Sequence, residues 1–376
     1  MRAFRVLPRR PRMGDGKIMP TLSIARSLLI AAFATVLPGV VWCQEPHGGS
    51  PTCTDDRFAP VLVDSLVMSE PFTPIVTMKE GRAYTTSIFW GSTVLVHRSA
   101  GASVDTIAKA GKSAADYRFI RALRLNGDAL VVFDAGTLRR TVVMPSGAVA
   151  TQQPIPLRMT EDGILMLNGE DYILNSVAPA HPLPLHLVNA DGDLVRSFGE
   201  KRPSGPPHEP FVLGWAGMPD RFWAAEMDRY RLVLWDTSGS IMRVVKREPE
   251  WWVARQFPAA VGSREEWPYP DFAGLLGIHQ RADVLIVVGR TPLLSQEMRT
   301  GEASSPRDWA QYFDTHVEFL DLRSASAELI ASCRFDAGLA FLVPPQQYLA
   351  TYEEPLGDRP GVYRFWDFPQ TALTAP

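Results

Sequence analysis

The sequence predicts an all-β fold built from a repeated unit of about four strands, and three observations lead to this prediction. First, a short β-rich run that ends in a polar turn with glycine occurs four times, and the glycines are separated by 46, 45 and 47 residues: Gly101, Gly147, Gly192 and Gly239. Second, two runs without the glycine, at 317–324 and 362–368, resume a spacing of 44 residues. Third, the 32 prolines and 28 glycines interrupt the chain too often for an array of helices.

A second kind of run precedes most copies of this pattern and predicts that each unit contains hairpins. These runs cover residues 126–133, 162–167 and 220–225. The first two begin with Asn-Gly and Asp-Gly, which are favourable in tight hairpin turns because glycine readily adopts a positive φ. Four strands repeating every ~40–50 residues are typical of a β-propeller blade. The sequence therefore predicts a six-bladed β-propeller.

The predicted ring closes through a strand near the N-terminus. Residues 61–67 alternate in character, precede the first repeat, and suit the missing strand of the last blade, whose own chain stops soon after Phe368. Sharing a blade between both ends of the chain removes an open sheet edge. The 85 residues from Gly239 to Ser324 are too many for one blade, so we predict an insertion after blade four at about 248–315.

Residues 1–43 have the pattern of a signal peptide. Arg26 precedes an apolar run at 27–37, and Val41 and Cys43 are small enough for the −3 and −1 cleavage positions. The run is shorter than the ~20 apolar residues of a spanning helix, and no later segment suits a membrane span. We predict an exported protein, periplasmic or secreted, whose mature part, 44–376, is a single domain. Lipid attachment at Cys43 is the alternative, which the bulky Trp42 before it disfavours.

Cleavage changes both the charge and the cysteine content. Residues 1–43 carry seven Lys or Arg and one Asp, so their removal takes the formal net charge from −3 to −9. An acidic chain repels phosphate backbones, so we expect no nucleic-acid partner. We also expect a monomer. Cys53 and Cys333 remain, and the predicted layout places them near one another, which makes them a candidate disulfide in an oxidising compartment. The alternative, two unrelated thiols, stays open.

Blade four resembles a known repeat. The run 222–239 is similar to the NHL repeat, with Ala225 and Glu226 where the first strand of the motif ends, Arg231 at its arginine, and a final Asp-x-x-Gly. The other blades match by period more than by residue. This resemblance implies a six-bladed, exported bacterial propeller of unassigned role, and it carries no catalytic residue with it.

The sequence predicts neither a catalytic residue nor a cofactor. It lacks a Gly-x-Ser-x-Gly elbow, and Gly111-Lys-Ser lacks the first glycine of a phosphate-binding loop, since Thr106 stands in its place. Asn189, Asp191 and Asp193 have calcium-loop spacing, but the later positions fail and a β-turn explains them better. The spacing of residues along the chain cannot reveal metal ligands, because propellers bring such ligands together from different blades.

The aromatic residues of the predicted insertion are the ligand-binding candidates. Trp251, Trp252, Trp267 and Tyr269 supply large contact surfaces at little cost in conformational entropy. Alternatively, they pack the insertion onto the propeller. We predict a noncatalytic recognition or scaffold protein that binds a protein, small molecule or glycan. The alternative is a metal-dependent hydrolase or lactonase, because propellers of the gluconolactonase type resemble this architecture and hold a divalent cation on the axis.

Overall fold

The structure, a computed structural model, divides the chain into residues 1–44 and 45–376, and all described residues lie in the second part. They are 51–68, 75–79, 82–86, 94–98, 104–108, 116–159, 163–167, 170–176, 181–200, 211–226, 229–252, 273–292, 313–336, 340–343, 348–353 and 361–369. These residues form β-strands and one 3₁₀ turn, η1 (Asp56–Phe58). None of the described elements is a helix with the length and apolar character to cross a bilayer.

The first three sheets are antiparallel and four-stranded, each built from consecutive strands. Sheet 1 contains β3 (Ile75–Lys79), β4 (Arg82–Thr86), β5 (Val94–Arg98) and β6 (Val104–Ala108). Sheet 2 contains β7 (Ile120–Asn126), β8 (Ala129–Asp134), β9 (Arg139–Val143) and β10 (Val149–Pro154). Sheet 3 contains β11 (Ile164–Met166), β12 (Tyr172–Asn175), β13 (Leu185–Val188) and β14 (Leu194–Phe198).

The next eight strands make two similar sheets that join into one. Sheet 4 contains β15 (Phe211–Trp215), β16 (Arg221–Glu226), β17 (Arg231–Asp236) and β18 (Ile241–Lys246). Sheet 5 contains β19 (Gly274–Arg281), β20 (Val284–Pro292), β21 (Phe313–Asp321) and β22 (Glu328–Phe335), with β1 (Thr52–Cys53) at its outer edge. A parallel pair between Trp215 and His279 joins the two sheets. The backbones approach closely beside this pair, where a Cβ on Gly214 would lie 2.2 Å from the carbonyl oxygen of Ile278.

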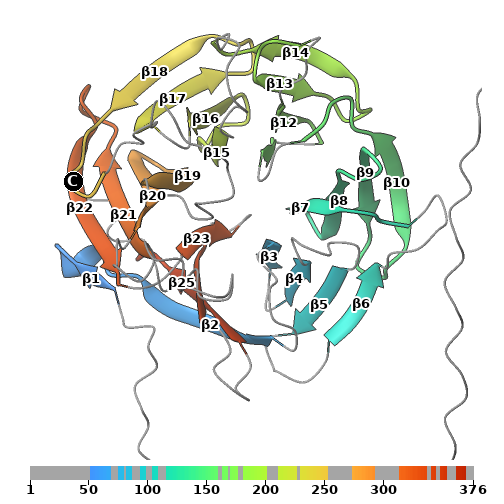
Figure 1. Cartoon of the computed structure of the whole chain (residues 1–376), viewed down its shortest axis with the longest axis horizontal. Coiled ribbons are helices and arrows are strands. Elements are labelled where there is room, and N and C mark those ends of the chain that lie inside the picture. Colours follow the sequence, from blue (N-terminus) through green and yellow to red (C-terminus); the bar gives the residue numbers. More distant parts are fainter. Residues whose placement is uncertain are drawn as a thin grey trace, which may run out of the picture. The chain divides into compact units, whose positions relative to one another are not determined.

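Sheet 6 combines the last three strands of the described chain with one strand from near its N-terminal end. It contains β23 (Ala340–Val343), β24 (Tyr348–Glu353) and β25 (Gly361–Asp367), and its fourth strand is β2 (Val61–Met68). β2 pairs antiparallel with β25, from Val61 opposite Asp367 to Met68 opposite Gly361. Within residues 45–376, the first strand of each labelled sheet lies toward a common centre and the fourth toward the periphery (Figure 1).

The core lies between neighbouring sheets. The described buried apolar residues form clusters that join sheets 1 and 2, 2 and 3, 3 and 4, 4 and 5, 5 and 6, and 6 and 1. In the last of these, Leu66, Ala350 and Phe365 of sheet 6 pack with Ala83 of sheet 1. Each sheet thus buries apolar side chains on both of its faces, which explains why continuous apolar runs occur in the inner strands.

The periodic glycines occupy one type of turn, between the third and fourth strands. Gly147, Gly192 and Gly239 have φ values of 85°, 88° and 86°, which favour glycine. In each case the glycine N–H donates to the carbonyl three residues before it. Asn189 makes this turn in sheet 3, where its side chain accepts a hydrogen bond from the N–H of Asp193 at 2.8 Å. The 45- and 47-residue spacings therefore measure the distance from one such turn to the next.

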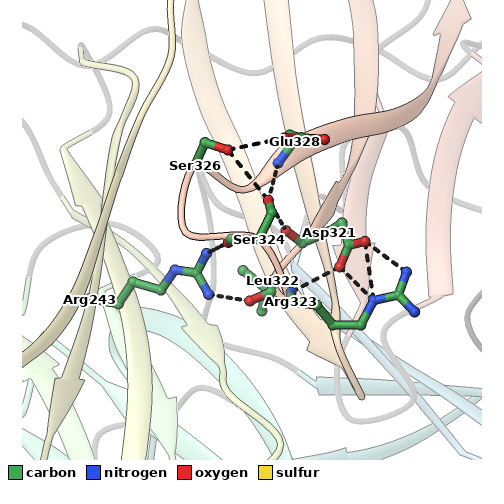
Figure 2. A network of polar contacts seen from close by, with 7 residues as sticks. All are labelled: Arg243, Asp321, Leu322, Arg323, Ser324, Ser326 and Glu328. Carbon is green, nitrogen blue, oxygen red and sulfur yellow. Dashed lines mark hydrogen bonds and ion pairs between the residues drawn. The ribbon is translucent and has the colours of Figure 1, made fainter.

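Arginines bind these turns from the preceding sheet. Arg196 of sheet 3 donates from Nη1 to the carbonyl of Ser238 in sheet 4 at 2.5 Å. Arg243 of sheet 4 donates to the carbonyls of Leu322 and Ser324 in sheet 5 (Figure 2). It also has a longer contact of 3.3 Å to the Ala325 carbonyl. Each arginine stands four residues after its own turn glycine, Gly192 or Gly239. The same turn thus shapes a hairpin and attaches it to its neighbour.

The N-terminal residues of the described chain fasten sheet 5 to sheet 6. β1 pairs with β22, and Cys53 and Cys333, opposite each other in this pairing, form a disulfide with an S–S distance of 2.10 Å. Phe58 of η1 is fully buried and its ring centroid lies 4.8 Å from that of Phe319. The chain then continues into β2 of sheet 6.

The predicted insertion at about 248–315 is wrong as a single segment, because β19, β20 and the start of β21 lie inside it. The turn between β19 and β20 contains Ala282 at φ 49°, so a non-glycine residue adopts the left-handed conformation. Ala327, at φ 51°, plays a similar part between β21 and β22. The β21–β22 turn follows the repeat copy recognised at 317–324, whereas the β19–β20 turn, without a glycine, did not show the repeat. The remaining parts of the predicted insertion, 253–272 and 293–312, lie outside the described residues.

Candidate functional site

The candidate site is a group of aromatic and charged side chains between sheets 4 and 5. It lies close to Trp252 and Pro292, the last described residues before 253–272 and 293–312. Its centre is Glu318 of β21, which is 2% exposed. We call it the Glu318 cluster, and its members are Tyr230, Arg247, Trp251, Trp252, His316 and Glu318. They come from the β16–β17 turn, the residues after β18, and β21.

Glu318 accepts contacts from three donors. The Tyr230 hydroxyl donates a short hydrogen bond to Oε2, and the indole N–H of Trp251 donates to Oε1 at 3.3 Å. Arg247 Nη2 lies 3.6 Å from Oε1 and supplies a positive charge. A buried carboxylate without such partners would carry a large desolvation cost, so this set explains how Glu318 remains inside the interface.

Trp251 packs on the face of the β20–β21 pair, over Gly289 and His316, which lie opposite each other. Its ring stacks on that of His316 with centroids 4.6 Å apart and planes at 3°. On the β20 side it lies against Gly289, where an added Cβ would come within 2.4 Å of the indole. The carbonyl of Trp251 accepts a hydrogen bond from the Thr291 hydroxyl at 2.8 Å. Ring, N–H and backbone are therefore all held by sheet 5.

Trp252 completes an aromatic group with Trp251 and Tyr230. Its ring centroid lies 5.6 Å from that of Trp251 and 5.5 Å from that of Tyr230, with edge-to-face geometry in both pairs. Both tryptophans are partly buried. Trp251 also stacks face to face on His316, whereas the ring contacts of Trp252 with described residues are edge-to-face, so Trp252 is the better placed of the two to contact a ligand.

Burial governs the protonation of this cluster. It raises the pKa of Tyr230 well above its ordinary value, and the neighbouring Glu318 carboxylate raises it further. Burial also lowers the pKa of His316 to about 4, against the opposing effect of Asp314. Tyr230 is thus a neutral donor and His316 a neutral aromatic ring at physiological pH. These states favour a fixed base for the aromatic group over proton transfer.

The structure brings together only part of the predicted ligand-binding set. Trp251 and Trp252 contact each other and sheet 5, whereas Trp267 and Tyr269 lie outside the described residues. Sequence reasoning missed Tyr230, Arg247 and Glu318. A signal existed for Glu318, since it is the charged residue within the apolar run Val317-Glu-Phe-Leu320, and a charge there must find partners if the strand is buried on both faces.

Outside the Glu318 cluster, the buried histidine of sheet 3 has structural partners. His186 is fully buried; its Nδ1 lies 2.8 Å from the Ser197 hydroxyl and its Nε2 lies 3.3 Å from the Ser176 carbonyl. Within the described ranges, no group of three or more His, Cys, Asp or Glu side chains is arranged to hold a metal ion.

No protein-family profile matches the sequence, and no curated protein matches it. Solved structures do show likeness. A member of the DUF4221 family from Bacteroides vulgatus is 11% identical, with a TM-score of 0.57, over 82% of this chain and 98% of that one. A protein from Bacteroides fragilis that is provisionally classed as exported is 8% identical, with a TM-score of 0.53, over 84% of this chain and 97% of that one.

These two likenesses show the fold alone, which is all-β and propeller-like. Virginiamycin B lyase from Staphylococcus aureus is also similar, at 9% identity over 80% of this chain and 98% of that one. Its TM-score of 0.44 is too low to support an inference about activity.

Proposed function

We propose that the mature chain is an exported, closed six-bladed β-propeller that recognises a ligand without catalysing a reaction. The six numbered sheets would be its blades, with β2 closing the ring. The apolar clusters between successive sheets, including the one between sheets 6 and 1, support this closure. Export is supported by the signal-peptide pattern of residues 1–43 and by the pairing of Cys53 with Cys333.

The recognition surface we propose lies at the Glu318 cluster. The single observation that carries this proposal is that a buried carboxylate and a stacked histidine hold Trp251, which in turn positions Trp252 at the start of residues 253–272. A preorganised aromatic ring binds a ligand with little further loss of conformational entropy. Trp267 and Tyr269, which the sequence suggests for the same surface, would contribute from that segment.

A binding assay with matched variants tests the proposal. We would probe a glycan array and a pull-down from periplasmic extract with the wild-type mature chain, with W252A/W267A/Y269A, and with V149A/V195A as a control. Val149 and Val195 are 50% and 55% exposed on the outer strands β10 and β14. We expect the triple variant to lose a binding partner that the control retains. Equal binding by all three proteins would contradict the proposal.

The hydrolase alternative needs a different measurement. Elemental analysis of the purified mature chain, before and after dialysis against a chelator, would show whether a divalent cation copurifies. Stoichiometric metal together with hydrolysis of a lactone by the untreated protein would favour the enzyme over the recognition protein.

A further inference from the structure

Arg290, at the end of β20, carries a charge without a partner in the part of the chain that the structure describes. Its guanidinium carbon lies 4.8 Å from the centroid of the Phe313 ring. Its Nε is buried and makes no hydrogen bond. Asp314 of the neighbouring strand forms an ion pair with Arg334, and among the described residues no carboxylate pairs with Arg290. Burial lowers the pKa of Arg290 to about 10, so the group remains a cation at neutral pH.

The direction of Arg290 follows from the alternation of β20. Gly289 and Thr291 lie against Trp251, on the face toward sheet 4. Arg290 therefore faces the other way, toward sheet 6, as Val288 does in the apolar cluster that joins sheets 5 and 6. Arg290 pairs with Thr315 on β21, and Phe313, two residues before Thr315, is its diagonal neighbour on the same face of the sheet. The residue as a whole is only partly buried, so solvent reaches some of the side chain.

A partly buried guanidinium without an anion is energetically unfavourable. Removing an ion from water costs several kcal/mol, and folded proteins normally offset that cost with a carboxylate or a set of carbonyl oxygens. Stacking on an aromatic ring supplies only part of it. Ionisable groups that burial perturbs in this way occur preferentially at functional sites.

We propose that Arg290 is the anchor of an anion-binding site at this end of sheet 5, and that its ligand presents a carboxylate or a phosphate group. The planar guanidinium binds either group through two parallel hydrogen bonds, and Phe313 holds its orientation. The mature chain has a formal charge of −9 and on average repels anions, so the site depends on the local positive charge of Arg290. The site adds a charge requirement to the proposed recognition function but does not depend on Trp252.

Thermal unfolding of the mature chain tests the proposal with R290M and a matched control, R140M. Arg140 is fully buried and bonded to Gln153 and Ala190, with Glu170 as its ion pair. In sodium chloride buffer, we expect R290M to have an unchanged Tm or one raised by roughly 2–4 °C, because an apolar chain replaces an unpaired charge. R140M should have a lower Tm, because its partners lose their donor.

Ligand probes complete the experiment at constant ionic strength. Glucuronate and inorganic phosphate are added separately, and glucose is the neutral control for glucuronate. We expect at least one anion to raise the wild-type Tm by more than it raises that of R290M, with R290K keeping part of the difference. A shift with glucuronate alone assigns a carboxylate ligand, and one with phosphate alone assigns a phosphate ligand.

Two results would overturn the proposal. One is a fall in the Tm of R290M comparable to that of R140M, or failure of R290M to fold, which would mean that the charge is paired within the chain. The other is an equal response of wild type and R290M to every anion. Either result leaves the Trp252 binding assay untouched, so the two proposals fail separately.

Discussion

Arg140 and Arg290 both lie beside an aromatic ring, but Arg140 is fully buried with its charge compensated, whereas Arg290 is partly buried without a described ion-pair partner. Arg140 Nη1 donates to Gln153 at 2.8 Å and to the Ala190 carbonyl at 3.0 Å, and Nη2 lies 3.2 Å from Glu170. Its guanidinium carbon lies 5.9 Å from the Tyr172 ring centroid. Arg290 lies over the ring of Phe313, and its buried Nε has no hydrogen-bond acceptor.

The difference shows that a buried charge does not by itself contribute to the stability of the fold; it does so only when other groups compensate it. Arg140 joins sheet 2 to sheet 3 through the turn that carries Gly192, and its partners offset its desolvation. The same is true of Glu318 between sheets 4 and 5. Arg290 joins nothing that the structure describes, so a binding role is the more economical explanation of why it is there.

The largest effect is expected from the compensated carboxylate. E318L would leave the Tyr230 hydroxyl and the Trp251 N–H without an acceptor and Arg247 without its counter-charge, at a cost of about 3–5 kcal/mol in the free energy of unfolding. E318Q keeps an acceptor and should cost less. Urea unfolding of both variants gives the comparison. Equal losses would mean that the hydrogen bonds contribute little.

R140M should lower the free energy of unfolding by about 2–4 kcal/mol, less than E318L because Glu170 is partly exposed and can turn to water. The measurement is chemical denaturation beside R290M, whose value we expect at or above wild type. If the two variants were destabilised alike, the distinction between a paired and an unpaired arginine would be lost.

A buried neutral base extends the comparison to pH. Burial lowers the pKa of His279 to about 3, and nearby Arg281 lowers it further. Between pH 6.5 and about 3, His279 therefore binds a proton in the unfolded chain but not in the folded chain. Stability should fall as pH decreases from 6.5 to 4, by up to about 3 kcal/mol from this residue. H279F should flatten the dependence; a slope identical to wild type would contradict the assignment.

The smallest effect is expected at the turn contacts. R243A removes the hydrogen bonds to the carbonyls of the β21–β22 turn and should cost about 1–2 kcal/mol, with R243K intermediate. Hydrogen exchange provides the sharper measurement: amides at 321–328, in the next sheet, should exchange faster. R323A is the control, because Arg323 pairs with Asp321 two residues away. Faster exchange confined to β18 would argue against a contact between sheets.

Much of the fold was predictable because it rests on local rules. Gly147, Gly192 and Gly239 adopt the positive φ that only glycine tolerates well, so their spacing marked the repeated hairpins directly. The strand at 61–67 was predicted to pair with the end of the chain, and β2 pairs with β25. Sheet 5 was misjudged because Ala282, and not a glycine, makes its β19–β20 turn, which left the inner strands inside a predicted insertion.

The candidate site was predicted only in part, and the reason is distance along the chain. Trp251 and Trp252 were noticed as aromatic residues in a polar stretch, but Glu318 is 67 residues from the Trp251 that it binds, and Tyr230 is 88 residues from Glu318. No pattern in the sequence distinguishes a charge that will meet a partner at such a separation from one that will not.

Local chemistry alone was therefore enough to establish the hairpins marked by Gly147, Gly192 and Gly239 and the acidic character of the chain after residue 43, since these depend on backbone conformation and composition. Which buried charges are compensated was settled by the way the sheets pack, because Coulomb and hydrogen-bond energies depend on positions in space. Arg140 and Arg290 look alike in the sequence and differ only in what the fold places beside them.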